Sequence, residues 1–489
     1  MMLAVLLFMP LAAGLLMLLM SSDVLRRVLL AATGAVHLAL VGVCFVHPPA
    51  SIGVLDPDAL SLVFLSLSSL LFFMASLYAV GYLREANPGS HRDPHDNQSF
   101  AKLPERHFCA CLCFFLAAMT LVAITRHLGI LWVGIGCTTL ATAPLIYFHK
   151  HRRSLEAAWK YLLMCSVGIA IALLGNILLS FAFQVPGAPQ ADFLYLPDLV
   201  LAAPQAQMPW LKAAFIFIFV GYGVKMGLSP LHNWLPDAHS EAPSLVSALL
   251  SGALLNCAFL GILRAHQVLF AAGLGDFSGG LLVFFGLVSM GTAAIFIVGM
   301  GHFKRLLAYS SVEHMGILAL GVGLGGSAVF GAMLHTVSHS LVKAMLFLLA
   351  GNILQHYRTT SSHDVRGMRR TMPLTAALWT AGFLAVAGLP PFGLFVSELS
   401  ILQAMLQQGR SVVAVLYLVF LAVIFIGMSV PVLRMVQASP APGLKTAYRE
   451  TLLNTGPPCV LCVLVLMLGV YVPPWITYCL RAAAGALGG

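Results

Sequence analysis

The chain has 489 residues, of which 60% are hydrophobic and only 9% are charged, whereas soluble domains carry about 25% charged residues. This composition excludes a soluble globular domain. The net charge of +9 does not indicate a nucleic-acid-binding protein, because the basic residues stand in short groups between apolar runs and form no single patch.

Apolar runs fill most of the chain and predict an all-α, polytopic membrane protein. A helix needs about 20 apolar residues to cross a bilayer, where no water satisfies an exposed backbone. We expect about fourteen transmembrane helices in one domain, residues 1–489. They are predicted at 2–20, 27–46, 59–83, 107–125, 128–148, 157–184, 211–234, 242–271, 277–300, 305–325, 328–355, 372–406, 411–436 and 458–484. The first run has no basic region before it, so it indicates a retained helix and no cleaved signal peptide.

The basic residues predict the orientation of the chain. When both termini are placed on the non-cytoplasmic side, 19 of the 26 Lys and Arg residues fall on the cytoplasmic side and 5 on the other. Cytoplasmic loops of membrane proteins carry such an excess. The two remaining basic residues, Lys225 and Lys343, lie inside predicted spans.

Lys225 is the first buried charge along the chain. About fifteen apolar residues precede it, and Gly227, Ser229 and Pro230 interrupt the helix that carries it. A lysine at bilayer depth costs at least about 2.5–3.5 kcal/mol on insertion scales, and a broken helix is tolerated only where its backbone faces protein or water. A lysine can also extend its ammonium to the membrane interface, but the position at a break favours a functional residue.

Three titratable residues follow one another on a later span. His335, His339 and Lys343 are spaced by four residues, which places them on one face of a helix, roughly 6 Å apart along its axis. A single histidine is more often a hydrogen-bonding residue between packed helices. Three such groups in register inside a membrane favour a proton relay.

Glu398 is the last of the ionisable residues whose burial inside the membrane is energetically costly. Pro390 and Pro391 break its span, and Glu398 lies about two turns into the second half. Broken helices with ionisable residues beside them are typical of the midplane sites of ion transporters. Together with Lys225, His335, His339 and Lys343, it is predicted to form a connected polar line.

A weaker group of acids and histidines surrounds these positions. Its members are the possible proton-uptake or accessory residues His232, Asp237, His239, Glu241 and Glu313. The first four could line a cytoplasmic proton path or could belong to the capping of the next helix. Glu313, with His314, is expected near the start of a span, where it could pair with Lys304 or Arg305. No zinc site is expected from these residues, because they straddle two prolines.

No metal site, cofactor site or catalytic residue is expected in this chain. Cys109, Cys111 and Cys113 form the only cysteine cluster, and their spacing cannot put all three on one helix face. The sequence has no phosphate loop, nucleotide fingerprint, haem motif or nucleophile elbow.

Four ordered motifs carry a resemblance over essentially the whole chain. They are GVKMGLSPLHNWLPDAHSEAPSLVSALLSGALLN, HFKRLLAYSSVEHMG, LHTVSHSLVKAMLF and GLPPFGLFVSEL. The chain resembles the antiporter-like subunits of respiratory complex I and of Mrp cation/proton antiporters. Within that family it is most similar to the hydrogenase-4/formate hydrogenlyase branch, component F, which the segments SLEAAWKYLL and SSVEHMG and the residue Asn256 suit.

The resemblance implies a fold and a set of partners. It implies two inverted five-helix repeats, about 107–271 and about 277–436, each with a broken helix. It also implies other membrane subunits in a prokaryotic inner membrane and a peripheral hydrogenase arm whose nickel–iron and iron–sulfur centres lie outside this chain. Lys225 matches the lysine of the first broken helix, Lys343 with His335 and His339 matches the central link, and Glu398 matches the acid of the second broken helix.

One match to the family fails. Relatives carry a glutamate in the fifth helix, in a segment that reads like IEATTL, where this chain has Ile135, Gly136, Cys137 and Thr138. Without that carboxylate, Lys225 is expected to release its proton more readily, because an opposite charge nearby stabilises the ammonium.

The sequence therefore predicts a proton-translocating membrane subunit of a group 4-type hydrogenase or formate hydrogenlyase-like complex, with coupling weakened at Gly136. Two alternatives stay open. One is an Mrp-type antiporter or complex I subunit, and the other is a structural membrane subunit without pumping.

Overall fold

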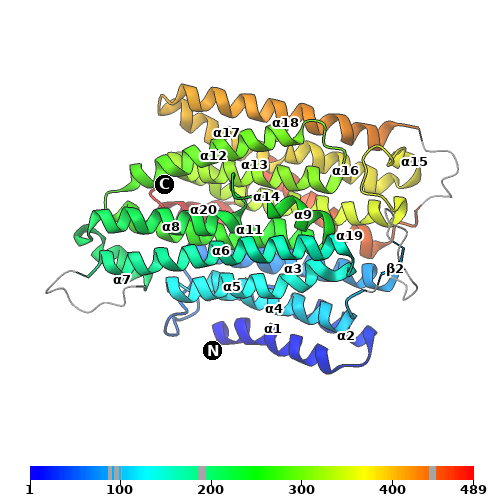
Figure 1. Ribbon diagram of the computed structural model, residues 1–489, viewed down its shortest axis with the longest axis horizontal. Coiled ribbons are helices and arrows are strands. Elements are labelled where there is room, and N and C mark those ends of the chain that lie inside the picture. Colours follow the sequence, from blue (N-terminus) through cyan, green and yellow to red (C-terminus); the bar gives the residue numbers. More distant parts are fainter. Residues whose placement is uncertain (86–90, 93–98, 101, 185–193, 440–447) are drawn as a thin grey trace.

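The structure is a computed structural model that describes residues 1–85, 91–92, 99–100, 102–184, 194–439 and 448–489. Its long helices run side by side along one direction (Figure 1). Within these ranges the only strands are β1 (His91–Arg92) and β2 (Ser99–Phe100), which pair antiparallel. The prediction of an all-α membrane protein is therefore confirmed.

Thirteen helices of the described chain are long and apolar enough to cross a membrane. They are α1 (Met2–Leu19), α2 (Asp23–Val46), α3 (Ala59–Glu85), α4 (Glu105–Ile124), α5 (Leu128–Ile146), α6 (Arg152–Ala182), α8 (Met208–Met226), the continuous run of α10 (Ser244–Leu249), η3 (Leu250–Leu254) and α11 (Leu255–Ala271), α12 (Gly275–Ile297), α13 (Phe303–Leu324), α14 (Ser327–Tyr357), α18 (Ser411–Gln437) and α19 (Leu452–Val470). The broken pair α16 (Pro373–Val386) and α17 (Gly393–Gln407) stands where the remaining predicted span lies.

Short helices complete the described elements. They are η1 (Tyr147–His149), α7 (Leu196–Ala202), η2 (Ala203–Gln205), α9 (Trp234–Glu241), α15 (Met368–Thr371) and α20 (Pro474–Gly485). One predicted span, 458–484, is wrong in its extent, because α19 ends at Val470 and α20 begins as a separate helix at Pro474. Proline has no backbone N–H to continue a helix, so Pro473 and Pro474 separate the two.

Both expected helix breaks are present. α8 ends at Met226 because Gly227 adopts a left-handed conformation with φ of 80°, which is readily available only to glycine. Pro230 follows in the connection to α9. In the second break, α16 ends at Val386, and Pro390 and Pro391 precede the start of α17 at Gly393.

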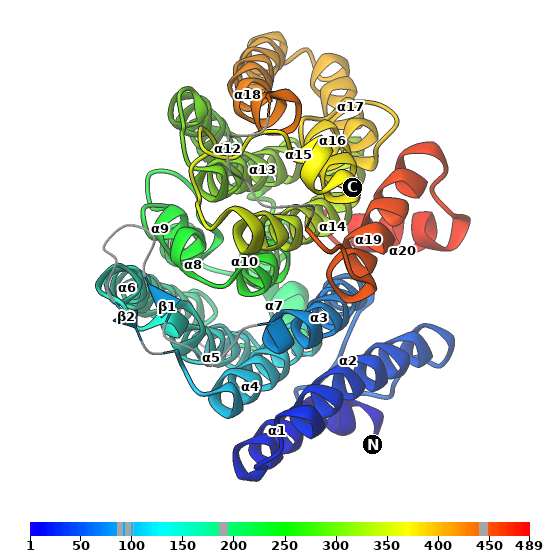
Figure 2. The same cartoon turned by 90° about the vertical axis from the view of Figure 1, so that its right-hand side faces the viewer.

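Seen along the helices, α1 and α2 lie at one edge of the molecule and α17 and α18 at the opposite edge (Figure 2). α14 and α10 lie between these edges. Close helix contacts depend on small residues: a Cβ placed on Gly286 of α12 would come within 2.7 Å of the Gly316 carbonyl oxygen on α13. Membrane helices pack closely through such residues. The division into two inverted repeats stays a prediction.

A buried ion pair fastens α11 to the start of α3. The guanidinium of Arg264 is fully buried and donates to both carboxylate oxygens of Asp58, at 2.6 and 2.8 Å. It also donates to Ser61 Oγ at 2.9 Å. Removing one partner of such a pair leaves an uncompensated buried charge, which costs about 3–5 kcal/mol.

We therefore expect Asp58→Ala to lower the thermal stability and the yield of the assembled protein. Asp237→Ala is the comparison, because Asp237 pairs with Arg305 and Lys160 at a partly exposed site, where ion pairs contribute about 0–1 kcal/mol. The measurement is the unfolding temperature in detergent. Equal unfolding temperatures for the two variants would contradict the structural role of Asp58.

Candidate functional site

Lys225 lies at the last turn of α8, is 1% exposed, and faces α5. Its ammonium donates to the carbonyl oxygen of Ile135 at 2.8 Å and to Thr139 Oγ1. The ring of Tyr161, on α6, lies 6.0 Å from the Lys225 Nζ. No ion pair of Lys225 with an acid is found among the described residues, so neutral oxygens hold this ammonium.

The fifth-helix position opposite Lys225 is Thr139, one turn after Gly136. A Cβ placed on Gly136 would meet no atom within 4 Å, so this position opens away from the packed interior. Lys225 nevertheless binds the Ile135 carbonyl oxygen, which belongs to the peptide bond to Gly136, and the assignment of Gly136 as the family's glutamate position stays a prediction. That no acid takes the place of the missing glutamate also stays a prediction.

Lys343 lies fully buried in the middle of α14 and has surroundings of the same kind. Its ammonium donates to the carbonyl oxygen of Leu307 at 2.9 Å and to Ser310 Oγ, both on α13. Glu313 is 2% exposed and lies about one turn after Ser310 on α13, although no hydrogen bond or ion pair joins it to Lys343 within the described residues. Lys343 thus has an acid in its neighbourhood, unlike Lys225.

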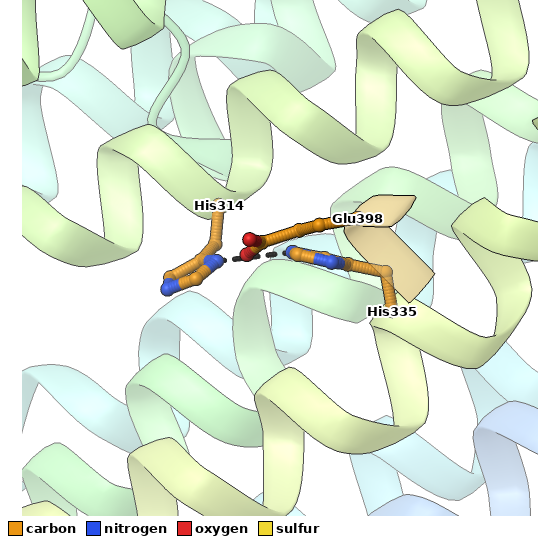
Figure 3. Close-up of side chains that lie close together, drawn as sticks. All are labelled: His314, His335 and Glu398. Atoms are coloured by element: carbon orange, nitrogen blue, oxygen red, sulfur yellow. Dashed lines mark hydrogen bonds between the residues drawn. The ribbon is translucent and has the colours of Figure 1, made fainter. Parts of the chain in front are cut away.

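His335, Glu398 and His314 converge from α14, α17 and α13 (Figure 3). His314 Nδ1 lies 3.0 Å from His335 Nε2, and His335 Nδ1 lies 3.0 Å from Ser397 Oγ. The Glu398 carboxylate is 6% exposed and sits beside both imidazoles. The structure therefore brings two of the five predicted line residues, His335 and Glu398, into one cluster.

His339 lies on α14 between His335 and Lys343, about one turn from each. Its ring centroid is 4.9 Å from that of His314 and 6.4 Å from that of His335. Both of its ring nitrogens are buried without a hydrogen-bond partner among the described residues. His314, His335, His339, Lys343, Glu313 and Glu398 are named here the second-half group.

Neutral polar residues of η3 and α11 bind to α13 and α14. Asn256 Nδ2, on α11, donates to Ser340 Oγ of α14 at 2.7 Å, and Ser251 of η3 shares a hydrogen bond of 2.8 Å with Ser311 of α13. Within the described residues, no hydrogen bond or ion pair joins Lys225 directly to the second-half group. The single connected line through all five predicted residues stays a prediction.

The weaker candidates do not gather at one site. Asp237 pairs with Arg305 and Lys160 at 2.7 and 2.9 Å, and Glu241 lies 3.5 Å from His151. His239 is buried and stacks on Phe347.

His232 also remains apart, since it lies against the rings of Phe296 and Tyr309. Of the group predicted as accessory, only Glu313 belongs to the second-half group.

The expected pairing of Glu313 and His314 with Lys304 or Arg305 is wrong. Lys304 donates instead to the carbonyl oxygens of Ser240 and Ala242, at 3.0 and 2.6 Å, and so caps the end of α9. Because α13 begins at Phe303, His314 lies about three turns inside the helix. The position of His314 well inside its span is the feature of the sequence that could have grouped it with the buried histidines.

Comparisons with known proteins agree with this architecture. The sequence profile of the NADH:quinone oxidoreductase/Mrp antiporter transmembrane family matches residues 125–427. A hydrogenase-4 component F homolog from Methylacidiphilum infernorum (isolate V4) is 33% identical over 453 residues, which cover 90% of this chain and 92% of that protein.

Two solved structures share the fold. A chain of the membrane-bound sulfane sulfur reductase, an archaeal respiratory membrane complex, has a TM-score of 0.86 at 20% identity, over 99% of this chain and 97% of that one. A chain of the Mrp complex from Dietzia sp. DQ12-45-1b has a TM-score of 0.84 at 19% identity, over 100% and 99% of the two chains. The profile match covers more than half of the sequence, and the chain therefore belongs to the NADH:quinone oxidoreductase/Mrp antiporter family of multi-pass membrane proteins.

Proposed function

We propose that this chain is the proton-translocating, antiporter-like membrane subunit of a group 4-type hydrogenase or formate hydrogenlyase-like complex. The observation that carries the proposal is the second-half group, in which six titratable side chains are buried together on α13, α14 and α17. Ionisable residues at such depth are costly and mark ion paths. The similarity to a hydrogenase-4 component F homolog supports the choice of complex.

The geometry suggests how a proton crosses the second half. Lys343 and the acid Glu313 can hold protons at the first part of the group, and His339 and His314, whose ring centroids are 4.9 Å apart, can carry a proton onward. The hydrogen bond between His314 Nδ1 and His335 Nε2 is short enough, at 3.0 Å, for direct transfer. Glu398, beside both imidazoles at the second helix break, can take up the proton from them.

Other membrane subunits are expected to pack against this chain, since its relatives belong to multi-subunit membrane complexes. We further propose a peripheral hydrogenase arm with nickel–iron and iron–sulfur centres. Purification with native partners tests both proposals. Recovery of the chain with membrane subunits but without any hydrogenase subunit would favour the Mrp-type alternative.

The proposed orientation places both termini outside the cytoplasm. Figure 1 shows the two termini toward one end of the helix bundle and β2 at the other. Reporter fusions in the loop around Arg92 and after Gly489 should therefore report opposite sides of the membrane. Reporters on the same side would contradict the predicted topology.

Lys225→Ala is expected to reduce proton translocation far less than changes in the second half. Lys225 is held by Ile135 and Thr139 and has no carboxylate with which to exchange a proton in the described chain. A positioned proton-transfer group typically contributes about 10²–10⁴-fold, so we expect a loss of less than about tenfold here. The measurement is proton uptake by vesicles that contain the complex.

Complete loss of proton uptake in Lys225→Ala, with normal assembly, would show that the first half conducts without its glutamate. If Lys225→Ala and Lys343→Ala both take up protons like the wild type, the result would favour the remaining alternative, a structural membrane subunit.

A further inference from the structure

The three side chains of Figure 3 have the composition and spacing of a metal site. His314, His335 and Glu398 each offer one ligand atom, and these atoms all lie within 4.8 Å of one another. The two imidazole nitrogens are 3.0 Å apart. A tetrahedral zinc ion with Zn–N bonds of about 2.0–2.1 Å holds its ligand atoms roughly 3.3 Å apart, so small side-chain rotations suffice to close the set.

We propose that His314, His335 and Glu398 bind a divalent transition-metal ion of the zinc class, and that the bound ion blocks proton transfer through the second-half group. The binding itself requires only the geometry of the three side chains. The block rests on the proposed function, because it requires that protons pass these residues.

The hydrogen bonds of His335 orient it as a ligand. The hydroxyl of Ser397 donates to the Leu394 carbonyl oxygen at 2.8 Å, so its oxygen is left to accept from His335 Nδ1–H. The lone pair of His335 is thereby on Nε2, the atom that points into the cluster. Histidines that bind metals usually donate their other ring N–H to a fixed acceptor in this way.

Two atoms of the site have unused bonding capacity. Glu398 Oε1 and His314 Nε2 are buried without a hydrogen-bond partner among the described residues. When Nδ1 of His314 binds an ion, its proton can move to Nε2, which is free to carry it. Buried polar atoms without partners are costly, and a bound ion would engage the Glu398 carboxylate.

Two further titratable residues lie beside the three ligands. Glu313 precedes His314 on α13 and is 2% exposed. His339, whose ring lies 4.9 Å from that of His314 and whose nitrogens have no partner in the described structure, is available as a fourth ligand. Imidazole ligands select zinc, copper, cobalt and nickel ions over sodium, magnesium and calcium ions.

Metal analysis of the purified native complex tests the binding. After exposure to Zn²⁺ and removal of free metal, the wild-type complex should hold one more Zn²⁺ than the His335→Gln and Glu398→Gln variants. His266→Gln is the control, because His266 is a buried histidine of α11 whose partner is Ser278, outside the site. It should keep the wild-type metal content. Equal zinc content in wild type, His335→Gln and Glu398→Gln would overturn the site.

Ser397→Ala keeps all three ligands and decides the question if the ligand variants fail to assemble. It should weaken Zn²⁺ binding by about 10–100-fold, since it removes only the partner that orients His335. Unchanged Zn²⁺ affinity in Ser397→Ala would count against the site.

Proton uptake tests the block separately. Zn²⁺ should inhibit uptake by the wild type and by His266→Gln, and a much higher concentration should be needed for Ser397→Ala. Specific zinc binding without inhibition of an active complex would overturn the block and leave the site standing. A complex that never translocates protons would refute the proposed function, while the metal analysis would still decide whether the site exists.

Discussion

Replacing Lys343 by alanine should nearly abolish proton translocation while the complex still assembles. Lys343 is fully buried, is held by the Leu307 carbonyl oxygen and the Ser310 hydroxyl, and is the only ammonium in the second-half group. A positioned proton-transfer group contributes about 10²–10⁴-fold to the rate of transfer. We therefore expect a loss of at least about a hundredfold in proton uptake per turnover of the complex.

Lys212→Ala is the matched control for this experiment. Lys212, on α8, is exposed, and among its described interactions it contacts only the ring of Phe277, 5.4 Å from its ammonium. Its loss should leave proton uptake close to the wild-type value. If Lys343→Ala assembles and translocates like Lys212→Ala, then the second-half group is not the proton path.

The ionisable residues that are buried in the membrane at an energetic cost could be predicted from the sequence. A lysine, a histidine row and a glutamate stand out in apolar runs, and the breaks at Gly227 and at Pro390 and Pro391 follow from residue type. Lys225, His335, His339, Lys343 and Glu398 are indeed buried in the structure. Their roles remain predictions, because burial shows their energetic cost and not what they transfer.

The partners of these residues could not be predicted in the same way. Lys225 and Lys343 are each held by a carbonyl oxygen and a hydroxyl, from Ile135 and Thr139 and from Leu307 and Ser310. Carbonyls belong to every residue, and threonine and serine are common in membrane helices, so neither leaves a signal in the sequence. Such contacts depend on how α5 and α13 are rotated against their neighbours, which hydropathy does not determine.

The tight turn behind Glu398 leads to a second strong expectation. Gly388 has a left-handed conformation with φ of 64°, and it lies in the break between α16 and α17. A Cβ at this position would lie 2.8 Å from the Cδ atom of Glu398 and would overlap its Oε2 atom. The glycine thus makes room for the carboxylate, and a methyl group must displace it.

Gly388→Ala should therefore impair proton translocation about as strongly as Glu398→Gln, although it changes no titratable group. Gly409→Ala separates the two effects of the methyl group, because Gly409 has a similar φ of 71° but open space around its Cβ position. Both variants carry the backbone cost of a left-handed residue, about 1–2 kcal/mol, and only Gly388→Ala disturbs Glu398. Proton uptake and the unfolding temperature should be measured for both. A similar fall in unfolding temperature with loss of uptake only in Gly388→Ala is the expected result. Normal uptake in an assembled Gly388→Ala complex would mean that the observed position of the Glu398 carboxylate is not required for transfer.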